Sequence, residues 1–175
     1  MLDALDAQPP APGLVVEVGP GSGCVLTAAA SKRGFGIGVD RNPAAAWLTT
    51  RTARTNGVLA DAVVGDFCSC LRPSVADMMI FNPPYVPTED DEVQDVTAAA
   101  YAGGDRGRRV IDRFINDPSV RVLADKGAFF FLLEERNCPE EVVAALAAVG
   151  LRGELVSSRK VPGERLTIWR FVWGQ

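Results

Sequence analysis

Leu14-Val15-Val16-Glu17-Val18-Gly19-Pro20-Gly21-Ser22-Gly23 is the stretch that decides the fold of this 175-residue chain. Its first half is a short run rich in β-branched residues, and its second half is a glycine-rich turn. The Ala-rich residues from Ser22 to Lys32 favour a helix, which Gly34 and Gly36 end. A strand, a tight turn and a helix in this order predict the first unit of an α/β fold, in which the turn lets the backbone approach a ligand closely.

The rest of the chain repeats this alternation of strands and helices. Further strands are predicted at Phe35–Val39, Leu59–Val64, Asp77–Phe81 and Ala128–Leu133. Further helices are predicted at Asn42–Gly57, Arg108–Ile115 and Pro139–Val149, and a terminal antiparallel hairpin at Leu151–Ser157 and Arg165–Trp173. Strands that alternate with helices give a parallel sheet with right-handed crossovers. We therefore expect one α/β domain over residues 1–175, with a seven-stranded, mostly parallel sheet and an antiparallel carboxyl-terminal hairpin.

Composition excludes several classes of protein. Hydrophobic residues make up 47% and charged residues 23%, as in a globular domain, and no apolar run approaches the roughly 18 residues of a membrane span. A net charge of −4 argues against broad affinity for nucleic acid, which depends on clustered Lys and Arg. Residues 1–11 contain two Asp and no Lys or Arg, unlike a secretion signal. We expect the protein in the cytosol or the nucleus.

No metal site is expected from this chain. It contains no histidine, and its four cysteines, Cys24, Cys68, Cys70 and Cys138, form no CxxC pair. Without histidine the usual general base is also missing, so the chemistry must proceed without one.

The glycine-rich turn is compatible with two kinds of cofactor. A dinucleotide-binding turn has the spacing G-x-G-x-x-G and holds a pyrophosphate at a helix amino terminus. Here Gly19, Gly21 and Gly23 follow the spacing G-x-G-x-G, Cys24 stands where the third glycine would be, and Glu17 precedes the turn by two residues. This pattern resembles the S-adenosylmethionine loop E-x-G-x-G-x-G of class I methyltransferases.

Acidic residues at two further strand ends agree with that resemblance. Asp40 ends the second predicted strand, where a carboxylate accepts hydrogen bonds from both ribose hydroxyls in either reading. The resemblance implies that Asp66 contacts the adenine amino group and that Phe67 lies against its ring. The simpler alternatives are that Asp40 caps the helix at Asn42 and that Asp66 is a turn residue.

Asn82-Pro83-Pro84-Tyr85 follows the apolar run Ala76–Phe81. An apolar run that stops at a Pro-Pro pair predicts a strand ending in a loop, at the edge where open α/β sheets bind ligands. The Asn82 side-chain carbonyl and the Pro83 main-chain carbonyl can accept both N–H bonds of a planar NH2 group, and Tyr85 can stack on it. Catalysis then comes chiefly from aiming a delocalised nitrogen lone pair at the methyl group. The simpler alternative is a Pro-Pro turn with a packed tyrosine.

This tetrapeptide resembles the N-P-P-Y motif of class I methyltransferases that act on amide or exocyclic amino nitrogens. Four further stretches are similar to the HemK-type subgroup in its eukaryotic and archaeal form: Ala100–Gly104, Gly107-Arg108, Ser158-Arg159, and Glu164 with Leu166. That subgroup uses S-adenosylmethionine, which leaves as S-adenosylhomocysteine, to methylate the glutamine N5 in the Gly-Gly-Gln tip of class-1 translation release factors.

The resemblance implies a role for each matched residue. It makes Asn82, Pro83 and Tyr85 catalytic and Asn82, Pro83, Pro84 and Tyr85 substrate-binding. It assigns the cofactor to Glu17, Gly19, Gly21, Gly23, Asp40, Asp66, Phe67 and Asn82.

The resemblance also implies a partner and an additional segment. Related enzymes work with a small zinc-binding activator subunit, and we hypothesise that it pairs with Leu59–Val64, an apolar strand expected at the sheet edge. Family members carry a further amino-terminal segment that closes over the cofactor, of which Met1–Leu5 matches only the last helical residues.

Other functions stay open. An N6-adenine methyltransferase acting on DNA or RNA needs a basic groove for an extruded base, and a lysine methyltransferase needs a base. A subunit that keeps the fold but only binds, or a dehydrogenase, is a further alternative. The long segment Pro87–Gly107 is expected to be a functional loop. We interpret Arg106, Arg108 and Arg109 as a solvated helix start paired with Asp105 or Asp112.

Overall fold

The computed structural model describes residues 1–8, 13–89 and 101–174. The amino-terminal part contains α1 (Leu2–Asp6), β1 (Gly13–Val18), α2 (Cys24–Arg33), β2 (Gly34–Asp40), α3 (Pro43–Thr55), β3 (Ala60–Val64) and β4 (Ala76–Phe81). The remainder contains α4 (Arg109–Ile115), β5 (Leu123–Glu134), α5 (Pro139–Ala148), β6 (Leu151–Val161) and β7 (Glu164–Trp173), with short 3-10 helices at Asp105–Gly107, Pro118–Val122 and Glu135–Asn137. Of the predicted functional loop, residues 90–100 lie outside the described residues, and so does Ala100 of the family-like stretch.

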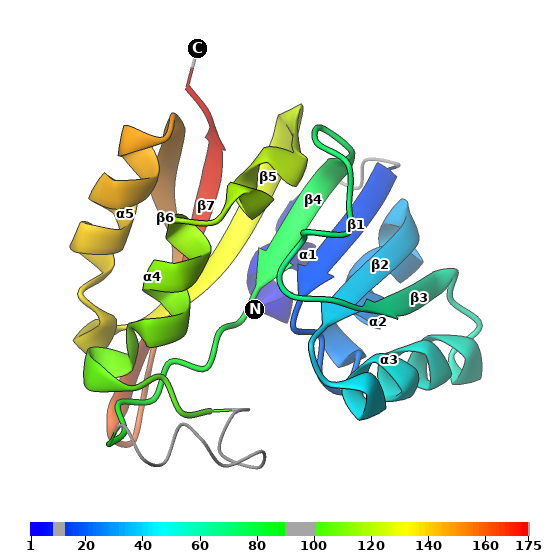
Figure 1. The fold of residues 1–175 in the computed structure, drawn as a ribbon, viewed down its shortest axis with the longest axis horizontal. Helices are drawn as coiled ribbons and strands as arrows, with labels where there is room; N and C mark the ends of the chain where they lie inside the picture. Colours follow the sequence, from blue (N-terminus) through cyan, green and yellow to red (C-terminus); the bar gives the residue numbers. More distant parts are fainter. Residues whose placement is uncertain (9–12, 90–100, 175) are drawn as a thin grey trace.

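All the strands form one sheet in the order β3-β2-β1-β4-β5-β7-β6 (Figure 1). The strands from β1 to β5 pair in parallel, whereas β7 runs antiparallel to both β5 and β6. This confirms the predicted seven-stranded, mostly parallel sheet with its antiparallel hairpin.

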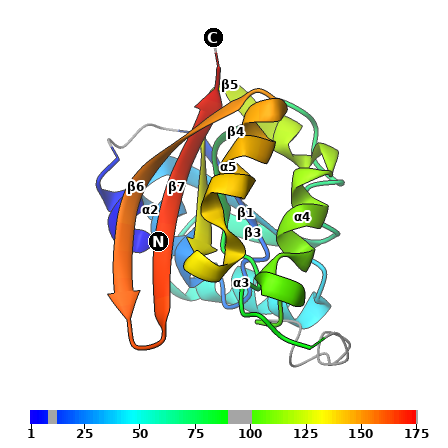
Figure 2. The ribbon, with the colours of Figure 1, turned by 90° about the vertical axis from the view of Figure 1, so that its left-hand side faces the viewer.

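Helices cover both faces of the sheet (Figures 1 and 2). Successive strand residues point to opposite faces, so each strand contributes to two cores. In β4, Met79 and Phe81 join the cluster under α4 and α5, while Met78 and Ile80 join the cluster under α1 and α2. Burial on both faces explains why β1, β4 and the second half of β5 are largely apolar without polar alternation.

Most predicted element boundaries lie within two residues of the observed ones; the larger differences are in β5 and in β6, which continues to Val161 rather than ending at Ser157. Helix α2 begins at Cys24 rather than Ser22, because Gly23 has a left-handed φ of 76° and still belongs to the turn. Strand β5 begins at Leu123 rather than Ala128 and passes through Gly127, where a Cβ would lie 2.6 Å from the Ala76 carbonyl oxygen. The predicted start of α3 is confirmed, since the Asn42 side chain accepts a hydrogen bond from the Ala44 N–H.

The carboxyl ends of the parallel strands share one edge of the sheet, the lower edge in Figure 1. The turn between β6 and β7 also lies there, because β7 runs antiparallel to β5. Segments far apart in sequence therefore meet at this edge.

Within residues 1–8, 13–89 and 101–174, no helix has the length and apolar character to cross a membrane.

Candidate active site

The glycine-rich turn joins β1 to α2 at the carboxyl edge. Gly19 and Gly21 have left-handed φ angles of 61° and 55°, and a Cβ at either position would meet no atom of the described residues within 4 Å. Gly23 differs, because its Cβ would lie 2.7 Å from Thr49 Cα of α3. The Gly19 N–H donates to the Val39 carbonyl, and the Thr49 hydroxyl donates to the Gly21 carbonyl. The turn is thus fixed on one side and open on the other.

Glu17 lies at the end of β1, only 2% exposed. Burial, the largest effect, raises its pKa to about 8; the Leu26 N–H in the first turn of α2 opposes that rise, and the Asp40 carboxylate adds to it. Its Oε2 is buried and has no hydrogen-bond partner in the described part of the chain. A buried carboxyl oxygen without a partner beside an open glycine turn fits a ligand that carries a cationic or N–H donor.

Asp40 ends β2 and holds the turn. Its Oδ2 accepts from the Gly21 N–H at 3.1 Å, and its Oδ1 accepts from the Asn42 N–H at 2.9 Å. The simpler alternative, in which Asp40 caps the helix at Asn42, holds in part, because Asp40 accepts from the Asn42 N–H while the Asn42 side chain itself caps α3. Each carboxylate oxygen can accept more than one hydrogen bond, so Asp40 can still accept from ligand hydroxyls.

Asp66 and Phe67 follow β3 and meet α4. The Asp66 carboxylate is 63% exposed and forms an ion pair with Arg113, a partner the sequence did not predict. The Arg113 guanidinium lies over the Phe67 ring at 4.3 Å, and that ring packs edge-to-face on Phe114 at 5.3 Å. Phe67 is 7% exposed, so it contributes to the core as well as to the wall of the site.

Asn82 is exposed at the end of β4, and Pro83 is buried behind it. Among the described residues, neither the Asn82 carboxamide nor the Pro83 carbonyl has a hydrogen-bond partner. The Tyr85 hydroxyl donates a long 3.5 Å bond to Glu164 Oε2 at the start of β7. Burial first, and then the Glu164 charge, raise the pKa of Tyr85 above its usual value of 10. The phenol therefore stays protonated near neutral pH and does not act as a base.

The segment Tyr101–Gly107 packs directly against the Asn82–Tyr85 motif. The Val86 N–H donates to the Tyr101 carbonyl at 3.0 Å, and the Gly103 N–H donates to the Val86 carbonyl at 2.8 Å. Asn137, which sequence analysis missed, also reaches this region, because its amide nitrogen donates to the Tyr85 carbonyl. The spacing of Glu134 and Asn137, which form a capping box, is the signal that could have identified it.

The arrangement combines an open glycine turn, acidic side chains at three strand ends, and two carbonyl acceptors that have no partner among the described residues. No group of three or more His, Cys, Asp or Glu that could hold a metal occurs in the described ranges. Such a site can bind a cofactor along the ends of β1 to β3 and orient an N–H-bearing group at the end of β4.

Comparisons with known proteins agree with a site that binds a cofactor at one part and an N–H-bearing group at another. A family model, the methyltransferase small domain, matches residues 1–147. The methyltransferase HEMK2 of Homo sapiens is 37% identical over 98% of this chain and 85% of its own. A putative protein N5-glutamine methyltransferase of Methanocaldococcus jannaschii is 33% identical over 89% of this chain and 81% of its own. Among solved structures, the E. cuniculi Mtq2–Trm112 complex, described as responsible for methylating the translation termination factor eRF1, contains a chain with a TM-score of 0.79 and 26% identity. The match covers 99% of this chain and 92% of the matched chain in that complex.

Proposed function

Because this chain belongs to the methyltransferase small domain family and is 37% identical to the methyltransferase HEMK2, we propose that it is a protein glutamine N5-methyltransferase. Its proposed substrate is the glutamine in the GGQ motif of a class-1 translation release factor. The observation that supports this most directly is the pair of unpartnered acceptors, the Asn82 carboxamide and the Pro83 carbonyl, at the end of β4.

We propose S-adenosylmethionine as the methyl donor. When bound, it supplies an electrophilic methyl group on a positively charged sulfur. The unpartnered Oε2 of Glu17 suits its ammonium group, and the open side of Gly19 and Gly21 leaves room for it. Asp40 would accept from ribose hydroxyls and Asp66 from the adenine amino group. The complete proposed set is Glu17, Gly19, Gly21, Gly23, Asp40, Asp66, Phe67 and Asn82.

The substrate amide is a poor nucleophile, because its lone pair is delocalised. Asn82 Oδ1 and the Pro83 carbonyl would accept its two N–H bonds and so direct the lone pair at the methyl group, with Pro84 and Tyr85 forming the wall of the substrate site. Positioning of this kind supplies most of the rate enhancement. Tyr85 keeps its own proton, so the spare substrate proton leaves to water after transfer.

Methyl transfer tests this proposal directly. Labelled methyl from S-adenosylmethionine should appear on a release factor, with the activator subunit present, and not on its Gly-Gly-Gln glutamine→Ala variant. Asn82→Ala should lower transfer about 100-fold, since misplaced reacting groups cost this much. Asn116→Ala, at an exposed asparagine just after α4, should leave transfer unchanged. Equal label on both release factors would refute glutamine methylation and favour lysine, and label on neither, with cofactor bound, would favour a nucleic-acid adenine.

We also propose that a small zinc-binding activator subunit covers the β3 edge. No strand pairs with the outer side of β3 within the described sheet, and Leu59, Val63 and Val64 are 72%, 42% and 57% exposed. An apolar strand edge of this kind needs a cover. The similar Mtq2 chain is in complex with Trm112, which supports this assignment.

A charge at this edge tests the assignment. Val63→Lys should abolish complex formation with such a subunit, whereas Val149→Lys, at the end of α5 with a comparable 45% exposure, should not. An intact complex with Val63→Lys would refute the edge assignment. We further propose that residues 1–175 form one domain that works in the cytosol, where release factors act, and the nucleus stays a second predicted compartment.

A further inference from the structure

We infer that Asn137 is the positioning residue of the Asn82–Tyr85 motif, which it holds through the Tyr85 carbonyl. The inference rests on the proposed function, because it concerns how the substrate amide is oriented. Asn137 is not among the residues proposed to contact the substrate or the cofactor.

The Asn137 side chain joins three backbone segments. Its Nδ2 donates to the Tyr85 carbonyl at 2.9 Å and to the Arg106 carbonyl at 2.8 Å, and its Oδ1 accepts from the Glu134 N–H at 2.8 Å. The side chain is 0% exposed, so water cannot replace these bonds. Both of its N–H groups are used, which leaves the amide one orientation.

The space around this amide is filled. A Cβ at Gly107 would lie 1.9 Å from the Tyr85 carbonyl oxygen and 2.5 Å from Asn137 Nδ2. A Cβ at Gly103 would lie 2.7 Å from the Pro84 carbonyl oxygen. The backbone of the motif therefore rests directly on the Tyr101–Gly107 segment, and Asn137 joins both.

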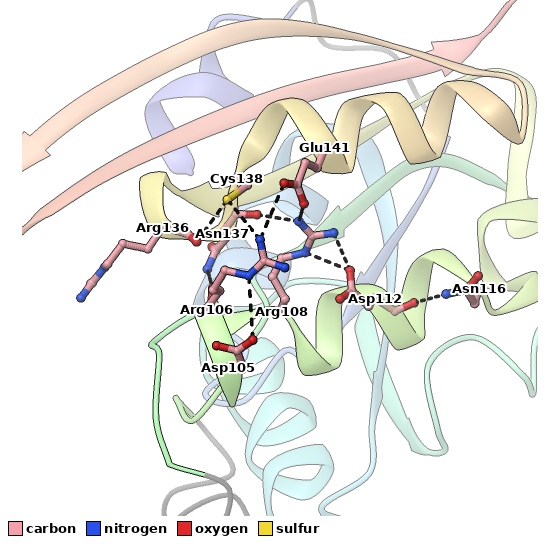
Figure 3. Close-up of polar contacts among 9 residues, drawn as sticks. All are labelled: Asp105, Arg106, Arg108, Asp112, Asn116, Arg136, Asn137, Cys138 and Glu141. Atoms are coloured by element: carbon pink, nitrogen blue, oxygen red, sulfur yellow. Dashed lines mark hydrogen bonds and ion pairs between the residues drawn. The ribbon is translucent and has the colours of Figure 1, made fainter.

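The Arg108 side chain contacts the backbone of Asn137 and not its side-chain amide (Figure 3). Arg108 donates to the Asn137 carbonyl at 2.9 Å and pairs with Asp112 and Glu141, so it joins the start of α4 to the start of α5. The predicted Arg108–Asp112 pair is confirmed, but the prediction that Arg108 is solvated is wrong, because its side chain is only 11% exposed. Arg108 thus joins the two helices, whereas the Asn137 amide bonds to the motif.

This separation allows a matched test. Asn137→Ala leaves the Tyr85 and Arg106 carbonyls without their buried donor, so the chain before Tyr85 relaxes and Asn82 and Pro83 lose their alignment. Arg108→Met loosens the same helix junction without removing any bond to Tyr85. A role confined to holding the helices predicts equal effects of the two substitutions.

The first measurement is steady-state methyl transfer to the release factor per folded molecule, together with the calorimetric Kd for S-adenosylmethionine. We expect Asn137→Ala to lower kcat about 30- to 100-fold while the cofactor Kd changes less than about threefold, since every proposed cofactor residue except Asn82 lies outside the motif. Asn137→Ser, which keeps one donor, should lose less, and Arg108→Met should keep kcat within about threefold. Equal losses in Asn137→Ala and Arg108→Met, no loss in Asn137→Ala, or a parallel loss of cofactor affinity would overturn the inference.

Hydrogen exchange provides a readout that does not depend on the substrate. The Val86 and Gly103 N–H groups, which bond across the motif and its supporting segment, should exchange at least tenfold faster in Asn137→Ala than in the unmodified protein or in Arg108→Met. Unchanged exchange would overturn the inference. An unmodified protein that transfers no methyl to the release factor would refute the proposed function instead, and hydrogen exchange would still decide whether Asn137 holds the motif.

Discussion

Replacing Glu17 with glutamine should remove a pH-dependent loss of stability. The folded protein raises the pKa of Glu17 from 4.5 to about 8, chiefly by burial, so the folded state keeps a proton that the unfolded chain has released. This contribution to stability is complete below pH 4.5 and is lost as the pH rises through 8. Each pH unit costs about 1.4 kcal/mol, so Glu17 costs the protein about 3 to 4 kcal/mol between pH 5 and pH 8.

The assay is urea unfolding at pH 5, 6, 7 and 8 in the absence of cofactor. A carboxamide does not titrate, and its oxygen can still accept from the Leu26 N–H. The free energy of unfolding of Glu17→Gln should therefore change less with pH than that of the unmodified protein, and it should be the larger of the two at pH 8. Glu135→Gln is the control, because that side chain is 68% exposed and its ion pair with Arg165 is long, at 3.8 Å. Its profile should follow that of the unmodified protein.

Parallel profiles for Glu17→Gln and the unmodified protein would refute this reasoning, because they would mean that Glu17 is ionised in the folded state. Added S-adenosylmethionine gives a second check. If its ammonium group meets Glu17, the ligand favours the carboxylate and should reduce the loss of stability toward pH 8.

Three further predictions concern glycine, cysteine and the core. Gly23→Ala should destabilise the protein by about 1 kcal/mol or more beyond Gly57→Ala. Both positions have a positive φ, but of the two only Gly23 has a backbone atom in the place that a Cβ would take. Urea unfolding midpoints measure the difference in stability, and equal losses in the two variants would contradict the collision. Cys68 is 1% exposed and burial, chiefly, raises its pKa to about 12, so iodoacetamide should label the exposed Cys24 in the folded protein and Cys68 only after unfolding, as peptide mapping would show. Phe114→Ala should cost about 3 to 5 kcal/mol in thermal or urea unfolding, because its fully buried ring contacts four other phenylalanines, and a loss under 1 kcal/mol would contradict this packing.

Much of the fold could be predicted because its signals are local. Apolar runs, turn glycines and the Asn42 cap each act over a few residues, and they identified the order of strands and helices. The start of β5 was missed because residues Leu123–Lys126 mix apolar and charged side chains, and their pairing depends on β4 rather than on propensity.

The candidate site was predictable to the extent that it follows strand ends. Glu17, Asp40 and Asn82 lie where their strands stop, so a strand prediction also located them. The partners of these groups come from distant segments, as with Arg113 beside Asp66 and Asn137 beside Tyr85. Pairings of this kind are set by tertiary packing, which no local pattern encodes.

The strand order also has a consequence for synthesis on the ribosome. Val15 can pair with Gly36 of β2 soon after it is made, but its other partner, Met78 of β4, is made only 63 residues after Val15. The glycine-rich turn can thus form early in synthesis. The hydrogen bonds of Tyr85 form later, because they require Asn137 and, last of all, Glu164 in the final strand. A nascent chain is therefore expected to acquire the means to hold its methyl donor well before it can present a substrate to it.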